Sequence, residues 1–235
     1  MIPDVAILAG GLATRLGDIA KAIPKSLLEI AGRPFLFHQF DLLEKEGVRK
    51  VVICAGHLAG RISEAVSAGR PWSFDVGFSI DGPALLGTGG AIIQALDKLS
   101  DPFFVIYGDS YLPVSLFAAA DAFPPEALSL MAVFKNDGRF DKSNVYFESG
   151  RILVYNKKKP TTAMRHIDYG LNIFRKAAFD EAPRKEAFDL SDLQTQLARR
   201  GKLAGWESAE RFFEIGSKAG LEELRKMLSK CPEAR

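Results

Sequence analysis

Cysteine, long apolar runs and net charge are all scarce in this sequence of 235 residues, and each scarcity excludes a class of protein. Its two cysteines, Cys54 and Cys231, lie far apart, so we expect free thiols in a reducing compartment rather than a disulfide framework or a zinc site. No apolar run reaches the ~18 residues of a membrane helix, and the start lacks a signal-peptide pattern. The net charge of +2 gives no overall attraction to nucleic acid or acidic membranes. We therefore expect a soluble cytoplasmic protein that binds neither.

Apolar residues are abundant, at 47%, so the chain can build a full core. Short apolar strands alternate with amphipathic helices from the N-terminus, which predicts an α/β fold with a parallel sheet and right-handed crossovers. We expect a single domain over residues 1–230 and a frayed tail over 231–235. The expected strands are 4–9, 50–55, 74–80, 103–107, 127–134, 144–147, 152–155, 166–174, 203–206 and 211–215. The expected helices are 34–46, 58–68, 91–99, 190–200 and 219–228.

The most informative stretch follows the first predicted strand, which ends at Gly10-Gly11. Thr14 and Arg15 come next, and Lys25 follows one short loop later. Glycine lets a ligand approach backbone N–H groups, and the two cations suit phosphate, so the stretch predicts a triphosphate site. The alternative is an ordinary turn with surface cations. No Gly-Lys-Ser/Thr closes the loop, so it is not a P-loop, and the missing third glycine argues against a dinucleotide-binding dehydrogenase.

The ordered set Gly-Gly-x-x-Thr-Arg-Leu…Pro-Lys resembles the N-terminal signature of sugar-1-phosphate nucleotidyltransferases, also called nucleotide-diphosphate-sugar pyrophosphorylases. Ala13 departs from the family, which usually has glycine there, and Gly17-Asp18 stands where a proline is common. The resemblance runs from Val5 to about Leu228. It implies a Rossmann-like α/β/α sandwich of the nucleotide-diphospho-sugar transferase type, GT-A-like, with a mostly parallel central sheet. Because we find no repeat and no hexapeptide array, we expect neither the acyltransferase β-helix nor the regulatory domain of longer members.

The implied reaction is attack of a sugar 1-phosphate on the α-phosphorus of a nucleoside triphosphate, with pyrophosphate leaving. The motif Leu-Gly-Thr-Gly-Gly looks most like heptose-1-phosphate guanylyltransferases and the related N-acetylmuramate-1-phosphate uridylyltransferases, which serve cell-surface glycan or cell-wall synthesis. The family's loop at this motif faces the base and ribose, although a plain glycine-rich loop is the alternative. The expected nucleotide-binding residues are Leu8, Ala9, Gly10, Gly11, Thr14, Arg15, Lys25, Asp81, Gly87, Thr88, Gly89 and Gly90.

The expected metal is Mg²⁺, the cofactor of the family. Asp109 follows a buried strand in Gly-Asp-Ser, which closely resembles the family motif whose aspartate holds magnesium, whereas a turn or helix-cap aspartate is the alternative. Glu214 stands where the family usually has a second metal-binding aspartate, and it brings the same carboxylate on a longer arm. Arg15, Lys25 and Asp109 are the expected catalytic residues. Arg15 would hold the β- and γ-phosphates, and Lys25 would stabilise charge around the α-phosphorus.

The acceptor site is predicted from the run Asn-Lys-Lys-Lys-Pro and from the strand after it. The run resembles the family's Glu-Lys-Pro, in which Lys159 would contact the sugar phosphate. Lys158 takes the place of a glutamate that reads sugar hydroxyls, so another residue must do so. The alternative for the three adjacent lysines is an ordinary solvated surface. The alternative for the strand 166–174 is a strand end that carries polar side chains without a ligand. The expected sugar-phosphate-binding residues are Tyr107, Lys159, Asp168, Tyr169, Gly170 and Asn172.

Base and acceptor are left partly open by the sequence. Asp81 can only accept hydrogen bonds when ionised, and guanine offers two adjacent donors, so we expect GTP ahead of UTP. One residue appears extra between Asp81 and Gly87 relative to the family. A phosphocholine cytidylyltransferase is a rival, with an aromatic cage drawn from Tyr107, Tyr111, Tyr146 and Tyr169. A catalytically silent nucleotide-sugar-binding subunit is another, suggested by Ala13, Lys158 and Glu214. The oligomeric state stays open.

Overall fold

The structure is a computed structural model that describes residues 2–11, 23–182 and 187–229. Thr14 and Arg15, predicted to bind the triphosphate, lie outside these residues, as does the predicted tail over 231–235. These predictions stay predictions. No helix in the described ranges is long and apolar enough to cross a bilayer.

A nine-stranded sheet forms the centre of the described chain, in the order β5-β4-β1-β6-β11-β8-β12-β10-β9. Neighbours pair in parallel from β5 to β6 and between β8 and β12, and antiparallel elsewhere. The sheet is therefore mixed, and the prediction of a mostly parallel sheet was wrong. The strands are β1 Val5–Leu8, β4 Lys50–Ala55, β5 Asp75–Ile80, β6 Phe103–Tyr107, β8 Ser129–Lys135, β9 Val145–Glu148, β10 Arg151–Tyr155, β11 His166–Phe174 and β12 Leu203–Ser208.

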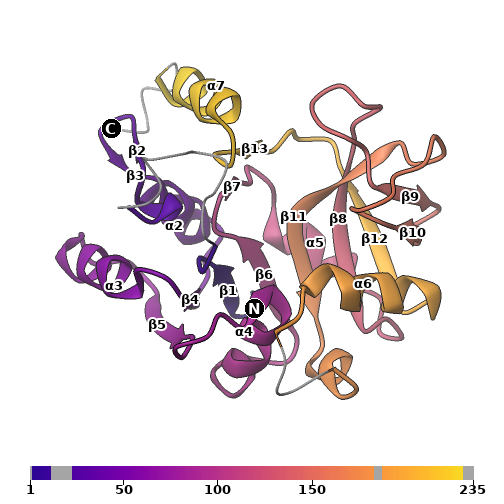
Figure 1. The fold of residues 1–235 in the computed structure, drawn as a ribbon, viewed down its shortest axis with the longest axis horizontal. Coiled ribbons are helices and arrows are strands. Elements are labelled where there is room, and N and C mark those ends of the chain that lie inside the picture. The colour runs from indigo at the N-terminus through magenta and orange to yellow at the C-terminus, as the bar shows by residue number, and fades with distance from the viewer. Residues whose placement is uncertain (1, 12–22, 183–186, 230–235) are drawn as a thin grey trace.

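The connections between successive strands differ in the two halves of the chain. In the first half of the chain, helices follow β4 and β5, and such crossovers give parallel neighbours. In the second half, β9 and β10 are joined only by Ser149-Gly150, whose φ angles are +50° and +76°. Two successive positive φ values suit a tight hairpin turn, which forces the strands to run antiparallel. Figure 1 shows the resulting division, with β1, β4 and β5 at one side and β9 and β10 at the other.

Helices cover both faces of the sheet. Side chains of α2, α3 and α5 pack on one face with Val5 and Ile7 of β1, and those of α4 and α6 pack on the other with Ala6. Alternation along one strand thus feeds two cores, which is why β1 reads as a continuous apolar run. The helices are α2 Phe35–Lys45, α3 Ala59–Ala68, α4 Gly87–Ala95, α5 Leu116–Asp121, α6 Leu190–Arg199 and α7 Lys218–Ser229, with short 3₁₀ turns η2 Lys25–Leu27, η3 Leu96–Lys98 and η4 Lys176–Phe179.

Two small sheets accompany the large one and place β13 and α7 near the end of β6. Strand β7 Ser110–Tyr111 pairs with β13 Phe213–Glu214, and β2 Glu29–Ile30 pairs with β3 Arg33–Pro34. Helix α7 packs its buried Leu224 and Leu228 on Leu28 and Ile30 in a third apolar cluster. This packing fixes Glu214 next to the segment that carries Asp109. The short helix α5 and the strands β2, β3 and β7 were not predicted, β13 lies within the predicted strand 211–215, and β4, β6 and β11 begin and end as predicted.

Candidate active site

Two cavities meet at the end of β6. The larger, about 640 Å³, lies between β11, the loop 136–144 and the β13–α7 segment, and we call it the β11 cavity. The smaller, about 490 Å³, lies between the end of β1, the loop after β5 and the start of α4, and we call it the β1 cavity. Tyr107 and Asp109 line both cavities. Ligands in the two cavities would therefore share one wall, at the strand ends where open α/β sheets bind them.

The β1 cavity gathers most of the residues predicted to bind the nucleotide. A Cβ at Gly11 would meet no atom within 4 Å, so the loop is open there, whereas one at Gly10 would lie 3.3 Å from the backbone nitrogen of Gly56. Gly89 and Gly90 are buried within α4 and do not line the cavity. The predicted residues that line it are Leu8, Ala9, Gly10, Gly11, Lys25, Asp81, Gly87 and Thr88.

The glycines at the start of α4 make room for Phe188, not only for a ligand. A Cβ at Gly87 would lie 2.5 Å from the Phe188 carbonyl oxygen, and one at Gly89 would overlap the Phe188 ring. The Gly89 N–H donates to the Phe188 carbonyl at 3.0 Å. Thr88 Oγ1 donates to Asp189 Oδ1 at 2.7 Å and accepts from the Leu190 N–H at 2.8 Å. The prediction that Gly89 lets the base approach the backbone is therefore corrected, because the Phe188 side chain occupies that space.

Asp81 lies beside the β1 cavity as predicted. Its Oδ2 accepts a hydrogen bond from the Leu86 N–H at 3.1 Å, which holds the loop after β5 in place. Its Oδ1 is buried and has no hydrogen-bond partner among the described residues. Leu85 packs close to Gly56 next to this carboxylate. Asp81 thus lines the cavity while one of its carboxylate oxygens is buried without a hydrogen-bond partner among the described residues.

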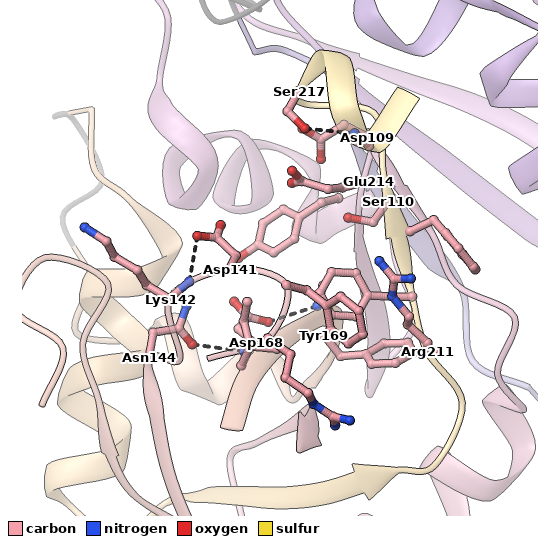
Figure 2. Close-up of a pocket in the computed structure, with 18 of the residues that line it drawn as sticks. Asp109, Ser110, Asp141, Lys142, Asn144, Asp168, Tyr169, Arg211, Glu214 and Ser217 are labelled. Atoms are coloured by element: carbon pink, nitrogen blue, oxygen red, sulfur yellow. Dashed lines mark hydrogen bonds between the residues drawn. The ribbon is translucent and has the colours of Figure 1, made fainter. Parts of the chain in front are cut away.

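Asp109 and Glu214 converge although they are far apart in the sequence. A Cβ at Gly216 would lie 3.3 Å from Asp109 Oδ2 and 3.4 Å from Glu214 Oε2, so both oxygens lie near one point. Figure 2 shows the two carboxylates together at the Ser217 end of the β11 cavity. Lys25 Nζ lies 3.3 Å from Asp109 Oδ2, on the side of the β1 cavity.

This pair of carboxylates fits magnesium. Mg²⁺ prefers hard oxygen ligands and is usually held by one or two carboxylates together with substrate phosphates. Among the described residues, no group of three or more His, Cys, Asp or Glu side chains could hold a metal by itself. The donor set at Gly216 is thus of the magnesium type rather than the zinc type.

Lys157 is the lysine of the predicted run that reaches the β11 cavity. Its Nζ lies 3.1 Å from Asp168 Oδ2 and 3.4 Å from the Tyr107 hydroxyl. Desolvation lowers the pKa of Lys157, but the Asp168 carboxylate and Tyr107 raise it by more, so the net pKa is above its usual value. Lys159, the predicted contact, is exposed and does not line the cavity, and its backbone N–H donates to Asn156 Oδ1 at 2.9 Å.

Asp168 lines the β11 cavity, but its oxygens are already engaged. Besides Lys157, they accept from the Tyr155 hydroxyl at 2.9 Å and from the Gly170 N–H at 3.0 Å. Burial, followed by the Asp168 charge, raises the pKa of Tyr155, which keeps the phenol protonated as a donor. The structure therefore makes Asp168 the holder of Lys157, whereas the sequence indicated a direct sugar contact.

The other predicted acceptor residues divide between the cavity and the core. Tyr169 and Gly170 line the β11 cavity, and burial raises the pKa of Tyr169 to about 12. Gly170 has a φ of +88°, and a Cβ there would lie 3.0 Å from Ser110 Oγ. Asn172 is fully buried away from the cavity, where its Oδ1 accepts from Gln194 Nε2 at 2.7 Å.

Comparison with known proteins decides the family. Residues 5–185 match the family described as the MobA-like NTP transferase domain. The chain belongs to this family. It is a nucleotidyltransferase, which overturns the dehydrogenase alternative.

Relatives of this nucleotidyltransferase cover nearly its whole length. The D-glycero-α-D-manno-heptose 1-phosphate guanylyltransferase of Aneurinibacillus thermoaerophilus is 28% identical over 91% of this chain and 93% of its own. The N-acetylmuramate α-1-phosphate uridylyltransferase of Neisseria meningitidis is 25% identical over 93% of this chain and 95% of its own. Among solved structures, HddC from Yersinia pseudotuberculosis complexed with GMP-PN is 25% identical, with a TM-score of 0.82 over 96% of this chain and 99% of its own.

Several residues that line the β11 cavity of the nucleotidyltransferase were not found from the sequence. The Phe140 ring is half-exposed, and the Arg211 guanidinium lies 3.7 Å from its centre. Both Arg211 terminal nitrogens bind the Glu223 carboxylate, at 2.7 and 2.6 Å. The signal that could have found part of this group is the charged loop between β8 and β9, because binding residues often lie on loops that a rigid scaffold positions. The residues missed there and nearby are Arg139, Phe140, Asp141, Lys142, Asn144, Lys157 and Arg211.

Proposed function

We propose that this enzyme transfers a nucleoside monophosphate from a nucleoside triphosphate to a sugar 1-phosphate and releases pyrophosphate. The triphosphate binds in the β1 cavity and the sugar phosphate in the β11 cavity. The observation that carries the proposal is the wall that the cavities share at Tyr107 and Asp109. The relatives named above act on sugar 1-phosphates with guanylyl or uridylyl transfer, which supports the same acceptor class here. Because the proposed donor is a nucleoside triphosphate, we propose that the reaction takes place in the cytoplasm.

The chemistry requires positioning and charge neutralisation more than proton transfer. The attacking phosphate oxygen is already an anion, so no general base is needed. Lys25, whose Nζ lies 3.3 Å from Asp109, stabilises negative charge at the α-phosphate. Lys157 holds the acceptor phosphate beside Tyr107. Arg15, as the resemblance implies, binds the outgoing pyrophosphate.

Magnesium dependence is part of the proposal. Asp109 and Glu214 would hold Mg²⁺ at the point beside Gly216 where their oxygens converge. When bound, the ion would neutralise charge on the phosphates and polarise the reacting group. Glu214 thus does what the usual aspartate does in the family. This convergence argues against a catalytically silent subunit, because such a protein has no need of two adjacent carboxylates here.

The acceptor class is favoured by what lines the β11 cavity. Of the four tyrosines that could cage a quaternary ammonium, Tyr107 and Tyr169 line it, whereas Tyr111 packs in the third apolar cluster. The rest of the wall combines Phe140, Phe212 and Phe213 with carboxylate, amide and cationic groups, and these polar groups suit hydroxyls and a phosphate. We therefore favour a hexose or heptose 1-phosphate destined for cell-surface glycan or cell-wall precursors over phosphocholine.

We favour GTP as donor, with UTP second. Asp81 lines the β1 cavity, and its buried Oδ1 has no hydrogen-bond partner among the described residues. Guanine can donate from N1–H and its 2-amino group to one carboxylate, while uracil offers a single donor. The HddC complex with GMP-PN, at 25% identity, agrees with this preference.

Pyrophosphate release tests the whole proposal. The enzyme is incubated with Mg²⁺, each of the five common nucleoside triphosphates in turn, and a panel of hexose and heptose 1-phosphates and phosphocholine. We expect turnover that depends on both a sugar 1-phosphate and Mg²⁺, and is fastest with GTP. Faster turnover with phosphocholine than with every sugar phosphate would show that the acceptor is wrong. Release with no acceptor dependence would contradict transfer altogether.

A further inference from the structure

Gln39 of α2 contacts the backbone on both sides of Asp109. Its side chain is 4% exposed, and its single amide nitrogen donates to the Tyr107 carbonyl at 3.1 Å and to the Ser110 carbonyl at 2.8 Å. One side chain thereby bridges the two ends of the turn Tyr107–Ser110. Asp109 projects from the middle of this turn into both cavities.

Other segments hold the same turn from different directions. The Gly108 N–H donates to the Leu8 carbonyl of β1 at 3.0 Å, and the Ile215 N–H donates to the Asp109 carbonyl at 2.9 Å. Gly108 is pressed so closely on β1 that a Cβ there would lie 2.6 Å from the Leu8 oxygen. With Gln39, the turn is fixed from β1, from the segment after β13 and from α2. The direction of the Asp109 carboxylate is set by this frame.

The chemistry of Gln39 is specific to an amide. The amide nitrogen carries two N–H groups and can donate to two carbonyls at once without bringing a charge into the buried site, whereas the isosteric glutamate would place oxygen against them. The Gln39 Oε1 atom is buried and has no hydrogen-bond partner among the described residues. An unpaired buried acceptor costs about 1–3 kcal/mol, so an apolar side chain would suit this position better for packing alone. The amide is therefore explained by the two bonds it makes to the turn.

We propose that Gln39 is a positioning residue that orients the Asp109 carboxylate toward Glu214 for metal binding. This inference builds on the metal site of the proposed function. Helix α2 is a firm base for the role, because Leu36, Phe40 and Leu43 on the same helix are buried in the core. Loss of the amide removes the direct link between the two ends of the turn, so that the Asp109 carboxylate is held less precisely toward Glu214 near Gly216. Residues that orient metal ligands in this way typically change metal affinity or activity by about 10–100-fold.

Binding of Mn²⁺ alone, measured by electron paramagnetic resonance of the free ion, tests the inference without relying on turnover. The variants are Gln39→Glu and Gln39→Met, which keep the side-chain length and remove the double donor. We expect both to stay folded by circular dichroism and to bind Mn²⁺ about tenfold more weakly or worse. Gln194→Met is the matched control, since Gln194 is also a buried glutamine but lies on α6 and contacts Asn172. It should bind Mn²⁺ like the parent.

Asp109→Asn separates this inference from the proposed function. We expect it to lose Mn²⁺ binding. If Asp109→Asn loses the ion while either folded Gln39 variant binds it as tightly as the parent, the positioning role is overturned and the metal site stands. If Asp109→Asn binds Mn²⁺ like the parent, the metal site itself is wrong and the role of Gln39 fails with it. Equal weakening in Gln194→Met would show a general effect of buried amides and would also overturn the role.

Discussion

The aromatic ring of Phe188 fills the space that a side chain at Gly89 would occupy. Phe188 precedes α6, whereas Gly89 lies in the first turn of α4, so the contact ties the wall of the β1 cavity to a distant part of the chain. The bonds between Thr88, Asp189 and Leu190 reinforce the same junction. The glycine-rich motif at the start of α4, predicted to form a ligand-binding loop, is therefore also a site of packing between α4 and the segment before α6.

Substitution Gly89→Ala should destabilise the protein in spite of its gain in helix propensity. Alanine favours a helix over glycine by about 1 kcal/mol, but overpacking against the Phe188 ring costs typically 1–3 kcal/mol. In a Phe188→Ala background the clash is gone, and Gly89→Ala should become neutral or stabilising. Urea unfolding of the four proteins of this cycle measures the difference. An equal effect in both backgrounds would contradict the packing explanation.

Lys157→Met should impair catalysis far more than Lys159→Met. Lys157 lies in the β11 cavity beside Asp168 and Tyr107, so its loss should lower kcat/KM for the sugar phosphate on the order of 10²–10³-fold, by analogy with other charge-stabilising donors. Lys159 is exposed and serves as the matched control, with about twofold change or less. Pyrophosphate release at varied acceptor concentration gives both values. A larger loss of kcat/KM in Lys159→Met than in Lys157→Met would show that Lys159 is the phosphate contact.

Asp81→Asn should reduce turnover selectively with GTP. Asparagine can keep the acceptor that binds the Leu86 N–H, but it replaces the unpaired carboxylate oxygen by a donor. Guanine would then face a donor, at a cost of about 1–3 kcal/mol, which corresponds to roughly a fivefold to 150-fold loss of kcat/KM. The assay compares GTP and UTP for both proteins. An equal small change with the two nucleotides would place Asp81 outside the base pocket.

Cys54 should make stability fall in alkaline solution. Burial raises the pKa of its thiol from 9.0 to about 12, so the folded protein keeps a proton that the unfolded chain loses. The contribution to stability is present below pH 9 and is lost as the pH rises toward 12. The slope is at most about 1.4 kcal/mol per pH unit. Denaturant unfolding between pH 8 and 10.5 in a Cys231→Ser background should show this slope, and Cys54→Ala should flatten it. Identical slopes of stability against pH in the proteins with and without Cys54 would refute the assignment of this pH dependence to the Cys54 thiol.

Much of the β1 side was predictable because its signals are local. An apolar run followed by Gly10-Gly11, and an aspartate directly after β6, place residues at strand ends whatever the rest of the chain does. The convergence of Asp109 and Glu214 could be expected only through the family resemblance, since β13 reaches β7 by tertiary packing. The mixed sheet had a local signal in Ser149-Gly150, but one hairpin does not fix where its strands join the others.

The lysine run shows why the rest could not be predicted. Matching to the family motif was anchored on Pro160 and so selected Lys159. In the structure Lys157 is the lysine that reaches Asp168, from the bend that follows β10. Alternation along a strand could not have indicated it, because Lys157 and Lys159 both differ from buried Tyr155 by an even number of residues. The roles of Gln39, Phe188 and Arg211 have no such local pattern, since each depends on a segment far away in the sequence.

Strand β11 belongs to both halves of the molecule at once. Leu171–Phe174 pair with β6 in the parallel half, and 166–168 pair with β8 and begin the floor of the β11 cavity. Between these two pairings the strand is irregular, because its register with β8 shifts between Asp168 and Asn172 and Gly170 has a φ of +88°. This irregularity lies in the wall of the β11 cavity. The spacing between the donor and acceptor cavities therefore depends on the backbone of one short segment of β11.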